Sequence, residues 1–463
     1  MSLEGDTIAA IATAAGVGGV GIIRLSGPEA VEIAEGVMGT SLDRTVKVGW
    51  ARNLFDEKID QVLAFVMRGP QSFTGEDVAE LHGHGGAQNL AVLLGEVIAR
   101  GARLADPGEF TRRAVLNGKL DLVRAEALLG VIHAGSERSL RLAQANLAGR
   151  LGDEAGALEA RVLVVLAEIE GRIDFPDDDL GEEEARVVDA ELVALADRTR
   201  GLAASFRHGR ALSTGVTVAL VGAVNAGKSS LLNALVGSER AIVAPEPGTT
   251  RDYVEAQMMW NGVAITLIDT AGLRSDAGPI EARGIELGAR RVDSADVVVV
   301  VNVSGGEIDR GDRYGSRAIV VRSKSDLDQS GTIDMLPLPS IYQFRMGLSF
   351  TDLGPSSQIS DHVLPTSAIT GAGIDELMER VLAVAGIGAG EEDAFITTER
   401  QFGLMSTAAT ALAAAVSARA KGAVSEVVAL ELRQASAALA QLRGLEVGER
   451  VLDEVFARFC IGK

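Results

Sequence analysis

The sequence predicts a multidomain protein: an α+β N-terminal domain, an α-helical domain, and an α/β domain inserted into the helical one. Three observations support this division. Short apolar segments broken by glycines fill residues 1–120, helical composition fills 121–214 and 386–463, and strands alternate with helices over 215–385. A chain of 463 residues allows two to four domains at roughly 100–200 residues each.

In the N-terminal segment, β-branched and apolar runs predict strands, and amphipathic runs between them predict helices. Glycines at the start of the segment mark the breaks between these pieces. The expected strands are Val20–Leu25, Val46–Trp50 and Gln61–Met67, and the expected helices are Pro28–Met38 and Ala87–Arg100. The pair His82 and His84 is expected to lie in a turn, and a metal site there is disfavoured because no third ligand is near.

From Asp121 to Arg207 the composition becomes rich in Ala, Leu, Glu and Arg, with apolar residues at helical spacing. The same composition returns at Thr398–Leu442. Two helical blocks that flank a different segment indicate a helical domain carrying an insertion. Such insertions are tolerated when the ends of the inserted domain lie close together.

The inserted segment alternates apolar runs with amphipathic ones, and this predicts a mostly parallel sheet covered by helices. The expected strands are Val216–Val221, Val263–Ile268, Val297–Val303, Ala318–Arg322 and His362–Pro365, with helices over Ser229–Val236 and Gly373–Val384.

Residues Gly222 to Ser229 fit the phosphate-loop pattern G-x-x-x-x-G-K-[ST], directly after a strand and at the start of a helix. The glycines let backbone N–H groups surround phosphate oxygens, and the helix N-terminus adds partial positive charge. Lys228 is expected to reach the β- and γ-phosphates, and the Ser229 hydroxyl to bind Mg²⁺.

A second motif, Asp269 to Gly272, ends the next apolar strand and completes the pattern of a nucleotide-dependent switch. Leu273 stands where Ras-like enzymes carry the glutamine that orients the attacking water, so another residue must do this. Glu281 and Glu286 are the candidates. Asn225 offers a side-chain oxygen to a cation, which would supply positive charge to the transition state.

Base selection is expected from Asp326, since a carboxylate can accept hydrogen bonds from guanine N1–H and the 2-amino group. Ser323 replaces the asparagine of the usual Asn-Lys-x-Asp motif, so we expect weaker guanine binding. Ser367 and Ala368 are similar to the last GTPase motif, whose backbone contacts the guanine oxygen.

These motifs together resemble the MnmE (TrmE) family of tRNA-modification GTPases. The resemblance extends to Asp6–Thr13, Gly18–Gly27, Ser72–Val78, His84–Gly86, Pro107–Arg113, Leu116–Leu122 and Phe459–Lys463, so it covers nearly the whole chain. It implies a tetrahydrofolate-binding, dimerising domain at 1–120, a helical domain at 121–214 plus 386–463, and a Ras-like P-loop GTPase domain at 215–385. The sequence departs from the family at Ala14–Gly19, where a proline pair and an arginine are missing.

The resemblance implies a K⁺-stimulated GTPase, activated by G-domain dimerisation, that modifies C5 of the wobble uridine of certain tRNAs. It implies a homodimer, the flavoprotein partner MnmG, and a one-carbon folate, 5-formyl- or 5,10-methylene-tetrahydrofolate. By position it implies Glu281 as the catalytic residue, Ser229 and Thr250 as Mg²⁺ ligands, Asn225, Ala244, Glu246 and Thr249 as K⁺ ligands, and Arg24, Glu80, Lys119 and Lys463 as folate contacts. The implied GTP-binding residues are Asn225, Ala226, Gly227, Lys228, Ser229, Ser230, Ala244, Pro245, Glu246, Pro247, Gly248, Thr249, Thr250, Asp269, Thr270, Ala271, Gly272, Ser323, Lys324, Asp326, Ser367 and Ala368.

Composition and charge exclude some classes of protein and indicate the cell compartment. The 44 Lys and Arg against 64 Asp and Glu give a net charge of −20, which argues against a protein that coats nucleic acid or an anionic membrane by bulk electrostatics. A single cysteine excludes an internal disulfide. No targeting or membrane-spanning segment is recognised, so we expect a cytoplasmic protein.

Two alternatives stay open at this level. A regulatory GTP-binding switch without modification chemistry would also carry the inserted domain, although it has no need for the N-terminal and C-terminal motifs. Cys460 is either a small buried hydrophobe or a functional thiol.

Overall fold

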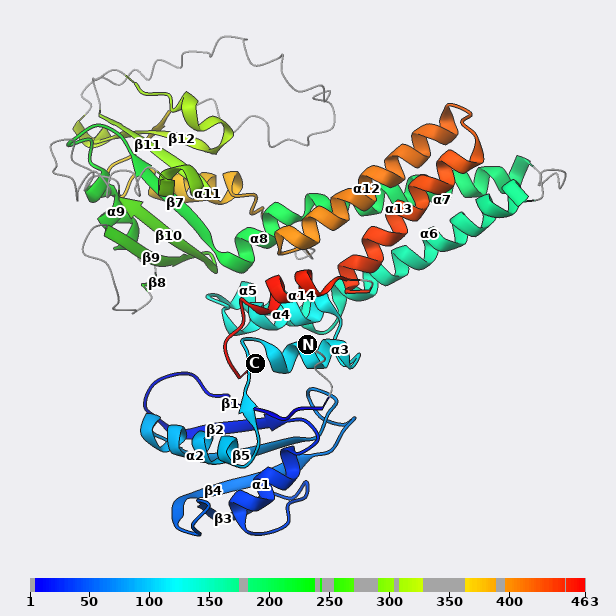
Figure 1. The fold of residues 1–463 in the computed structure, drawn as a ribbon. Coiled ribbons are helices and arrows are strands. Elements are labelled where there is room, and N and C mark those ends of the chain that lie inside the picture. The colour runs from blue at the N-terminus through cyan, green and yellow to red at the C-terminus, as the bar shows by residue number, and fades with distance from the viewer. Residues whose placement is uncertain are drawn as a thin grey trace. The chain divides into compact units, whose positions relative to one another are not determined.

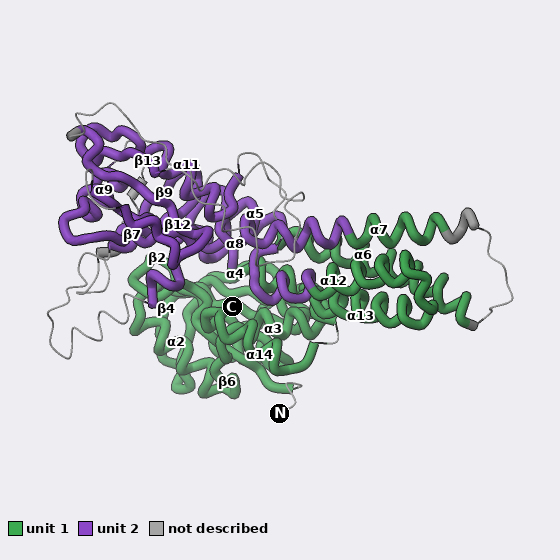
Figure 2. Tube along the Cα trace, turned by 90° about the horizontal axis from the view of Figure 1, so that it is seen from above, with its two compact units in different colours: residues 1–129, 146–196, 407–463 green, residues 130–145, 197–406 purple. Residues whose placement is uncertain are grey.

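The computed structural model describes residues 5–174, 182–237, 242–243, 254–269, 290–303, 308–327, 363–388, 396–445 and 447–462. The chain divides into two compact units, one of residues 1–129, 146–196 and 407–463, the other of residues 130–145 and 197–406 (Figure 2). Both units are therefore assembled from segments that lie far apart in the sequence. The predicted fold class, helical and α/β parts together with an α+β N-terminal part, is confirmed (Figure 1).

The first unit begins with a six-stranded sheet in the order β3-β4-β5-β2-β1-β6, antiparallel except between β1 and β6. Helices α1 and α2 pack on one face of it. The strands are β1 Ile8–Ile11, β2 Gly18–Ser26, β3 Lys47–Arg52, β4 Lys58–Met67, β5 Val78–Gly85 and β6 Arg103–Leu104, and the helices are α1 Ala30–Met38 and α2 Ala87–Ala99. The predicted strands and helices of this segment are all present.

Strand β5 was not predicted, and the expectation that His82 and His84 lie in a turn is wrong. Residues Ala79 and Leu81 of β5 point into the core with α1 and α2, and the alternate residue Glu80 points to the opposite face. Its neighbours toward β3 on that face include Val48 and Leu63, which are 66% and 42% exposed. One face of the sheet is thus packed by helices and the other is partly open.

Seven further helices belong wholly or partly to the first unit, and all but the first of them lie in the segments predicted to be helical. They are α3 Glu109–Leu116, α4 Leu122–Ile132, α6 Arg150–Asp174, α7 Glu182–Ala204, α12 Glu399–Ala420, α13 Ser425–Arg443 and α14 Glu449–Phe456. Helices α6 and α13 run side by side and are joined by ion pairs from Arg433 to Glu170 and from Arg443 to Glu159. The C-terminal segment packs on α4 through Leu122, Phe456 and Phe459.

Among the described residues, α12 is the one helix long and apolar enough to cross a membrane by length and composition alone. Its residues Ala408, Ala411, Leu412 and Ala415 are buried. Buried residues make up 33% of its apolar window.

The second unit is built on a seven-stranded sheet in the order β13-β12-β11-β7-β10-β9-β8. Its central strands pair in parallel, as predicted, and β9 and β8 add an antiparallel edge that was not predicted. The strands are β7 Val216–Val221, β8 Ile242–Val243, β9 Val254–Trp260, β10 Val263–Asp269, β11 Val297–Val303, β12 Ala318–Ser323 and β13 Leu364–Pro365, and the helices are α5 Glu137–Leu147, α8 Phe206–Thr214, α9 Lys228–Val236 and α11 Ile374–Val384.

A buried ion-pair network fixes the N-terminal strand of the first unit. Arg113, 3% exposed, contacts Glu109 at 3.0 Å, Asp6 at 2.7 Å and Glu76 at 3.2 Å, and Arg103 contacts Glu109 and Asp6. Burial opposes ionisation of Glu109, but hydrogen bonds from Arg103, from the Asp106 N–H and from Arg113 outweigh it and lower the pKa of Glu109. The pKa of Asp6 is lowered in the same way.

Arg113→Ala is predicted to reduce the free energy of unfolding by roughly 3 kcal/mol, because it removes the buried cation from Glu109, which keeps only Arg103 and the Asp106 N–H, and removes one of the two cations that pair with Asp6. Since the folded-state pKa values of Asp6 and Glu109 lie below the unfolded ones, the stabilisation is complete near neutral pH and is lost as pH falls below about 4. Urea unfolding of the parent and the variant, near neutral pH and again below about pH 4, measures the difference in the free energy of unfolding. The exposed pair of Arg141 and Glu137 is the control, and Arg141→Ala should cost about 0.5 kcal/mol or less; equal costs for the two variants would contradict the prediction.

Candidate nucleotide-binding site

The phosphate loop connects the end of β7 to the start of α9, and glycine is required at both of its ends. Gly222 has φ +146°, and a Cβ there would lie 2.2 Å from the carbonyl oxygen of Val301 on β11. Gly227 has φ +93° and begins the helix. Asn225 is also left-handed, with φ +61°, a conformation that asparagine tolerates better than most residues. The backbone of the loop is therefore set by its position between β7 and β11.

Lys228 places a positive charge inside this loop. Its side chain is 5% exposed, and its Nζ donates to the carbonyl oxygens of Gly222 and Ala223, each at 2.8 Å. Burial lowers the pKa of Lys228, and the negative charge of Asp269 opposes that shift. An ammonium group surrounded by backbone and directed into the loop is suited to bind phosphate oxygens that enter it.

Ser229 and Asp269 are brought together by the parallel pairing of β7 with β10, in which Leu220 lies opposite Asp269. The Ser229 hydroxyl donates to Asp269 Oδ2 at 2.6 Å. Two hard oxygen donors at the phosphate end of a loop match the ligands that Mg²⁺ prefers. These residues fit a magnesium ion bound together with nucleotide phosphates, with Ser229 as the direct ligand.

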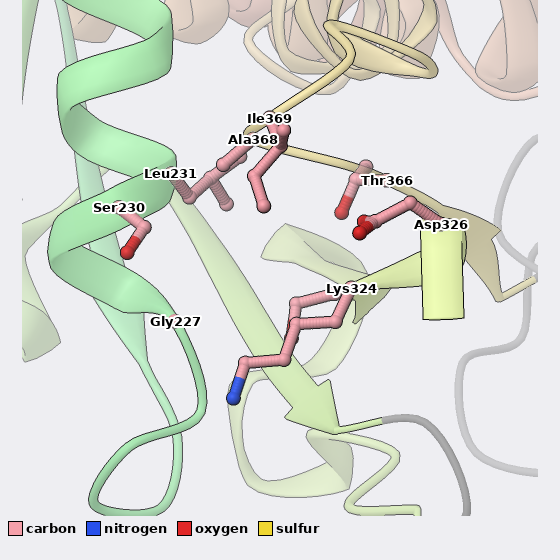
Figure 3. A pocket seen from close by; sticks show the side chains of 9 residues that line it. Gly227, Ser230, Leu231, Lys324, Asp326, Thr366, Ala368 and Ile369 are labelled. Atoms are coloured by element: carbon pink, nitrogen blue, oxygen red, sulfur yellow. The ribbon is translucent and has the colours of Figure 1, made fainter. Parts of the chain in front are cut away.

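A pocket of about 230 Å³ adjoins the loop (Figure 3). Figure 3 shows Ser230 and Leu231 on the α9 side, with Lys324 and Asp326 across from them. The Asp326 carboxylate accepts a hydrogen bond from the Ser367 hydroxyl at 2.7 Å, so its orientation is fixed from the β13 side. The full lining is Gly227, Ser230, Leu231, Ser323, Lys324, Asp326, Thr366, Ala368 and Ile369. The structure thus brings the predicted base-binding residues together beside the phosphate loop.

Ser323 ties the base-binding strand to the phosphate loop. Its hydroxyl lies 2.5 Å from the carbonyl oxygen of Ala226 and 3.0 Å from that of Asn302. The adjacent Lys324, left-handed with φ +58°, donates from Nζ to the carbonyl of Asn225 at 3.4 Å. Although serine is shorter than the asparagine of the usual motif, it keeps the contact with the phosphate loop.

The predicted folate residues Arg24 and Glu80 face each other across β2 and β5, with Arg24 Nε donating to Glu80 at 2.9 Å. The guanidinium lies 5.8 and 5.9 Å from the ring centroids of Phe73 and Phe110, and its NH1 lies 3.4 Å from the carbonyl of Gly462. Phe110 is fully buried, whereas Phe73 is half-buried, so a charged pair beside the Phe73 ring has the elements for binding a flat, polar ring system.

Lys119, the third predicted folate residue in the described chain, is bonded elsewhere, to the carbonyl of Pro70 at 2.8 Å. The C-terminal tail reaches the Arg24 region through Gly462, where a Cβ would lie 2.3 Å from the carbonyl oxygen of Ile11. Cys460 is exposed, so its interpretation as a buried hydrophobe is wrong. The tail therefore carries an exposed thiol two residues before Gly462, whose carbonyl accepts from Arg24.

Part of the predicted site lies outside the described residues. This applies to Ala244, Pro245, Glu246, Pro247, Gly248, Thr249, Thr250, Thr270, Ala271, Gly272, Glu281, Glu286 and Lys463. No group of three metal-ligating side chains occurs in the part of the chain that the structure describes.

Sequence reasoning missed Asn302, which supports the nucleotide pocket from β11. Its side chain accepts from the backbone N–H of Asp309 at 2.8 Å and donates to the carbonyl of Asp309 at 3.0 Å, while its own carbonyl faces Ser323. The sequence did contain a signal that could have identified Asn302, because it is the one polar residue in a strand whose other residues are all valine. Phe73, Phe110 and Gly462 lie within the motifs Ser72–Val78, Pro107–Arg113 and Phe459–Lys463 that carry the resemblance, but they were not predicted as neighbours of Arg24.

Two family models match the chain, a model of the MnmE helical domain over residues 122–460 and a model of the GTP-binding protein TrmE N-terminus over residues 7–119. A protein of Symbiobacterium thermophilum named tRNA modification GTPase MnmE is 38% identical over 473 residues, which cover 99% of each chain. One of Myxococcus xanthus with the same name is 39% identical over 474 residues and covers 100% of each. Among solved structures, the G domain of the T. maritima FeoB iron transporter is 26% identical, covers 37% of this chain and 98% of its own, and has a TM-score of 0.24.

The arrangement around Asp326 predicts a change of base preference. In Asp326→Asn the amide oxygen can still accept from Ser367, but the amide N–H₂ meets the N–H donors of guanine instead of accepting from them. GTP affinity should fall roughly tenfold or more, and XTP, which carries an oxygen in place of the 2-amino group, should bind better than in the parent.

Competition of GTP and XTP against a fluorescent nucleotide measures this prediction. Asp312→Asn, an exposed aspartate of the 3-10 turn Asp312–Arg317, is the control and should leave both affinities unchanged. A loss of GTP binding without any gain for XTP would mean that Asp326 does not face the base.

Proposed function

The chain belongs to the MnmE family of tRNA modification GTPases, and on that premise we propose that it uses GTP hydrolysis to modify C5 of the wobble uridine of certain tRNAs. The observation that carries the proposal is the match to both family models together with relatives named MnmE over the full length of the chain. We propose a flavoprotein partner, MnmG, a one-carbon tetrahydrofolate, 5-formyl or 5,10-methylene, as the carbon source, and the cytoplasm as its location.

For GTP hydrolysis, the described residues would bind the nucleotide phosphates and supply positive charge beside them. Lys228 holds positive charge in the phosphate loop, and Ser229 beside Asp269 would hold Mg²⁺ with Thr250. A bound magnesium ion would neutralise charge that develops on the phosphates. Because Leu273 cannot orient water, we assign that role to Glu281, at the position that the family motif gives to the catalytic glutamate.

Potassium is proposed as a further activator, with Asn225 as its side-chain ligand and Ala244, Glu246 and Thr249 completing the site. In support, Asn225 sits at the turn of the phosphate loop, and its backbone carbonyl is engaged by Lys324. A side-chain oxygen on a loop held in this way is suited to a monovalent cation, which would add positive charge next to the phosphates.

Folate is proposed to bind at Arg24 and Glu80, with Lys119 and Lys463 as further contacts. The support is the pairing of Arg24 with Glu80, with the guanidinium close to the rings of Phe73 and Phe110. The half-buried ring of Phe73 can stack on a pterin, whereas Phe110 is fully buried and supports Arg24 from within the core. The charged pair can bind the polar edge of the pterin, or Arg24 the folate carboxylates. The exposed thiol of Cys460 lies on the tail that contacts Arg24 through Gly462, which makes it the candidate functional thiol of this site.

A homodimer is proposed to form through the N-terminal domain, whose sheet has a partly open face. Val48 and Trp50 on β3 and Leu63 on β4 point away from the helix-covered core, and Val48 is paired with Leu63. Apolar and aromatic side chains that stay exposed on a sheet face are typical of an interface. A second copy of the chain is the partner that the family leads us to propose.

The modification itself is tested in cells that lack this chain. Digested tRNA from such cells should lose the C5 modification of the wobble uridine, as measured by mass spectrometry of nucleosides. A plasmid copy should restore the modification, and a Lys228→Ala copy should not, because it cannot hold the phosphates. An unchanged nucleoside profile would leave the chain as a GTP-binding switch without modification chemistry.

The potassium site is tested by GTP turnover in K⁺ and in Na⁺ at matched ionic strength. The parent should be faster in K⁺ by roughly tenfold, about 1.4 kcal/mol of transition-state stabilisation, and Asn225→Gly should lose most of that difference while keeping the left-handed backbone accessible. Asn261→Gly is the matched control, since Asn261 is also left-handed with φ +49° but lies in the β9–β10 turn. A K⁺ effect that survives Asn225→Gly would assign the cation to other ligands.

The dimer surface is tested with Val48→Asp, which places a charge in the middle of the proposed interface. Sedimentation velocity should show a shift from dimer to monomer, because a desolvated, unpaired carboxylate opposes association. Val92→Asp, on α2 where Val92 is 41% exposed, changes the helix layer and should leave the dimer intact. Dimerisation that is equally strong in both variants would place the interface elsewhere.

A further inference from the structure

His82 lies on β5 two residues after Glu80, so both side chains are on the face of the sheet opposite helices α1 and α2. The Nε2 atom of His82 lies 2.8 Å from Oε2 of Glu80. Since the oxygens of a carboxylate accept, the proton of this hydrogen bond is on His82 Nε2. His82 therefore donates to a residue of the proposed folate site, although it is not one of the predicted folate contacts.

The two oxygens of Glu80 are held from two directions. Oε1 accepts from Arg24 Nε at 2.9 Å, across the pairing of β5 with β2, and Oε2 accepts from His82. The Glu80 side chain is 10% exposed. The last torsion of a glutamate side chain is only weakly restricted, so one hydrogen bond leaves the carboxylate free to turn, whereas donors on both oxygens fix its plane. The orientation in which Glu80 meets Arg24 thus depends on His82.

The imidazole of His82 is itself held in place. Its ring lies edge-on to the ring of Phe65 on β4, with the centroids 5.3 Å apart and an interplanar angle of 61°. Phe65 is the residue of β4 opposite Glu80, so it is a diagonal neighbour of His82 on the same face of the sheet. Edge-to-face contact is a favoured geometry of aromatic pairs. The ring is thus restrained by packing as well as by its hydrogen bond.

Arg24 extends this restraint to the C-terminal tail. Its Nε donates to Glu80, and its NH1 donates to the carbonyl oxygen of Gly462 at 3.4 Å. A guanidinium is a rigid, planar fork, so the direction of one N–H group sets the directions of the others. Gly462 is buried, and Lys463, a proposed folate contact, follows it directly in the chain. Hydrogen bonds in series therefore join His82 to the tail.

We propose that His82 is a positioning residue of the folate site: by fixing Glu80 it aligns Arg24, and through Arg24 it holds the C-terminal tail against the sheet. This role rests on the proposed binding of a tetrahydrofolate at Arg24 and Glu80. It makes the affinity for folate depend on a side chain that acts through the two contact residues.

Two substitutions separate the hydrogen bond of His82 from its ring. His82→Phe keeps an aromatic ring beside Phe65 and removes the donor, whereas His82→Gln removes the ring and keeps an N–H donor at a similar reach. In titrations of the purified full chain with 5-formyltetrahydrofolate, His82→Phe should weaken binding roughly tenfold, and His82→Gln should stay within about threefold of the parent. His133→Phe, at an exposed histidine, is the matched control and should leave the affinity unchanged. Equal weakening by both His82 variants would overturn the role of the hydrogen bond.

The tail is observed separately, in protein without folate. Ile461 is 57% exposed, and a Cys460→Ser, Ile461→Cys protein carries a spin label on its one cysteine, next to Gly462. The electron paramagnetic resonance spectrum should show a more mobile label after His82→Phe, because the restraint on Gly462 is lost, and an unchanged label after His82→Gln. A spectrum that His82→Phe leaves unchanged would overturn the link from His82 to the tail.

The two readouts distinguish failure of the positioning role from failure of the folate site. A parent that does not bind 5-formyltetrahydrofolate, but whose tail is released by His82→Phe, would overturn the proposed folate function and support the contact from His82 to the tail. A parent and a His82→Phe variant that bind folate equally well would overturn the positioning role and leave the folate site in place.

Discussion

The parallel pairing of β7 with β10 and β11 is the constraint on which the nucleotide site depends. It brings the carboxyl ends of three strands to one edge of the sheet, so that Gly222, Asp269 and Asn302 all lie next to the phosphate loop. Ligands of open α/β sheets bind at this edge. Gly222 is confined there by the carbonyl of Val301, and any larger residue would push β7 and β11 apart.

Much of the second unit follows from the sequence, because its signals are local. An apolar run followed by a phosphate-loop pattern specifies a strand, a turn and a helix in order, and the structure has them at the expected residues. The edge strands β8 and β9 and the N-terminal strand β5 were not predicted. In β5 the residues Gly83 and Gly85 interrupt the apolar alternation, and only pairing with β2 and β4 makes the segment a strand.

Side-chain contacts between distant segments were beyond sequence analysis. The replacement of asparagine by Ser323 was visible, yet its contact with Ala226 depends on how closely β12 approaches the phosphate loop. In the same way, the resemblance pointed to Arg24 and Glu80, but the rings of Phe73 and Phe110 beside them come from the loop after β4 and from α3. The tail residue Gly462 joins that region from the far end of the chain, and its lack of a side chain is required by the approach of Ile11.

We propose that the edge of the sheet in the second unit binds a guanine nucleotide, with phosphates at Lys228 and Ser229 and the base at Asp326. Equilibrium titration of the purified full chain with GTP and with ATP, each with Mg²⁺, tests this most directly. Saturable binding of GTP, with no measurable binding of ATP at concentrations that saturate GTP, is the predicted result. Equal affinity for the two nucleotides would contradict the assignment of Asp326 and with it the base-binding half of the site.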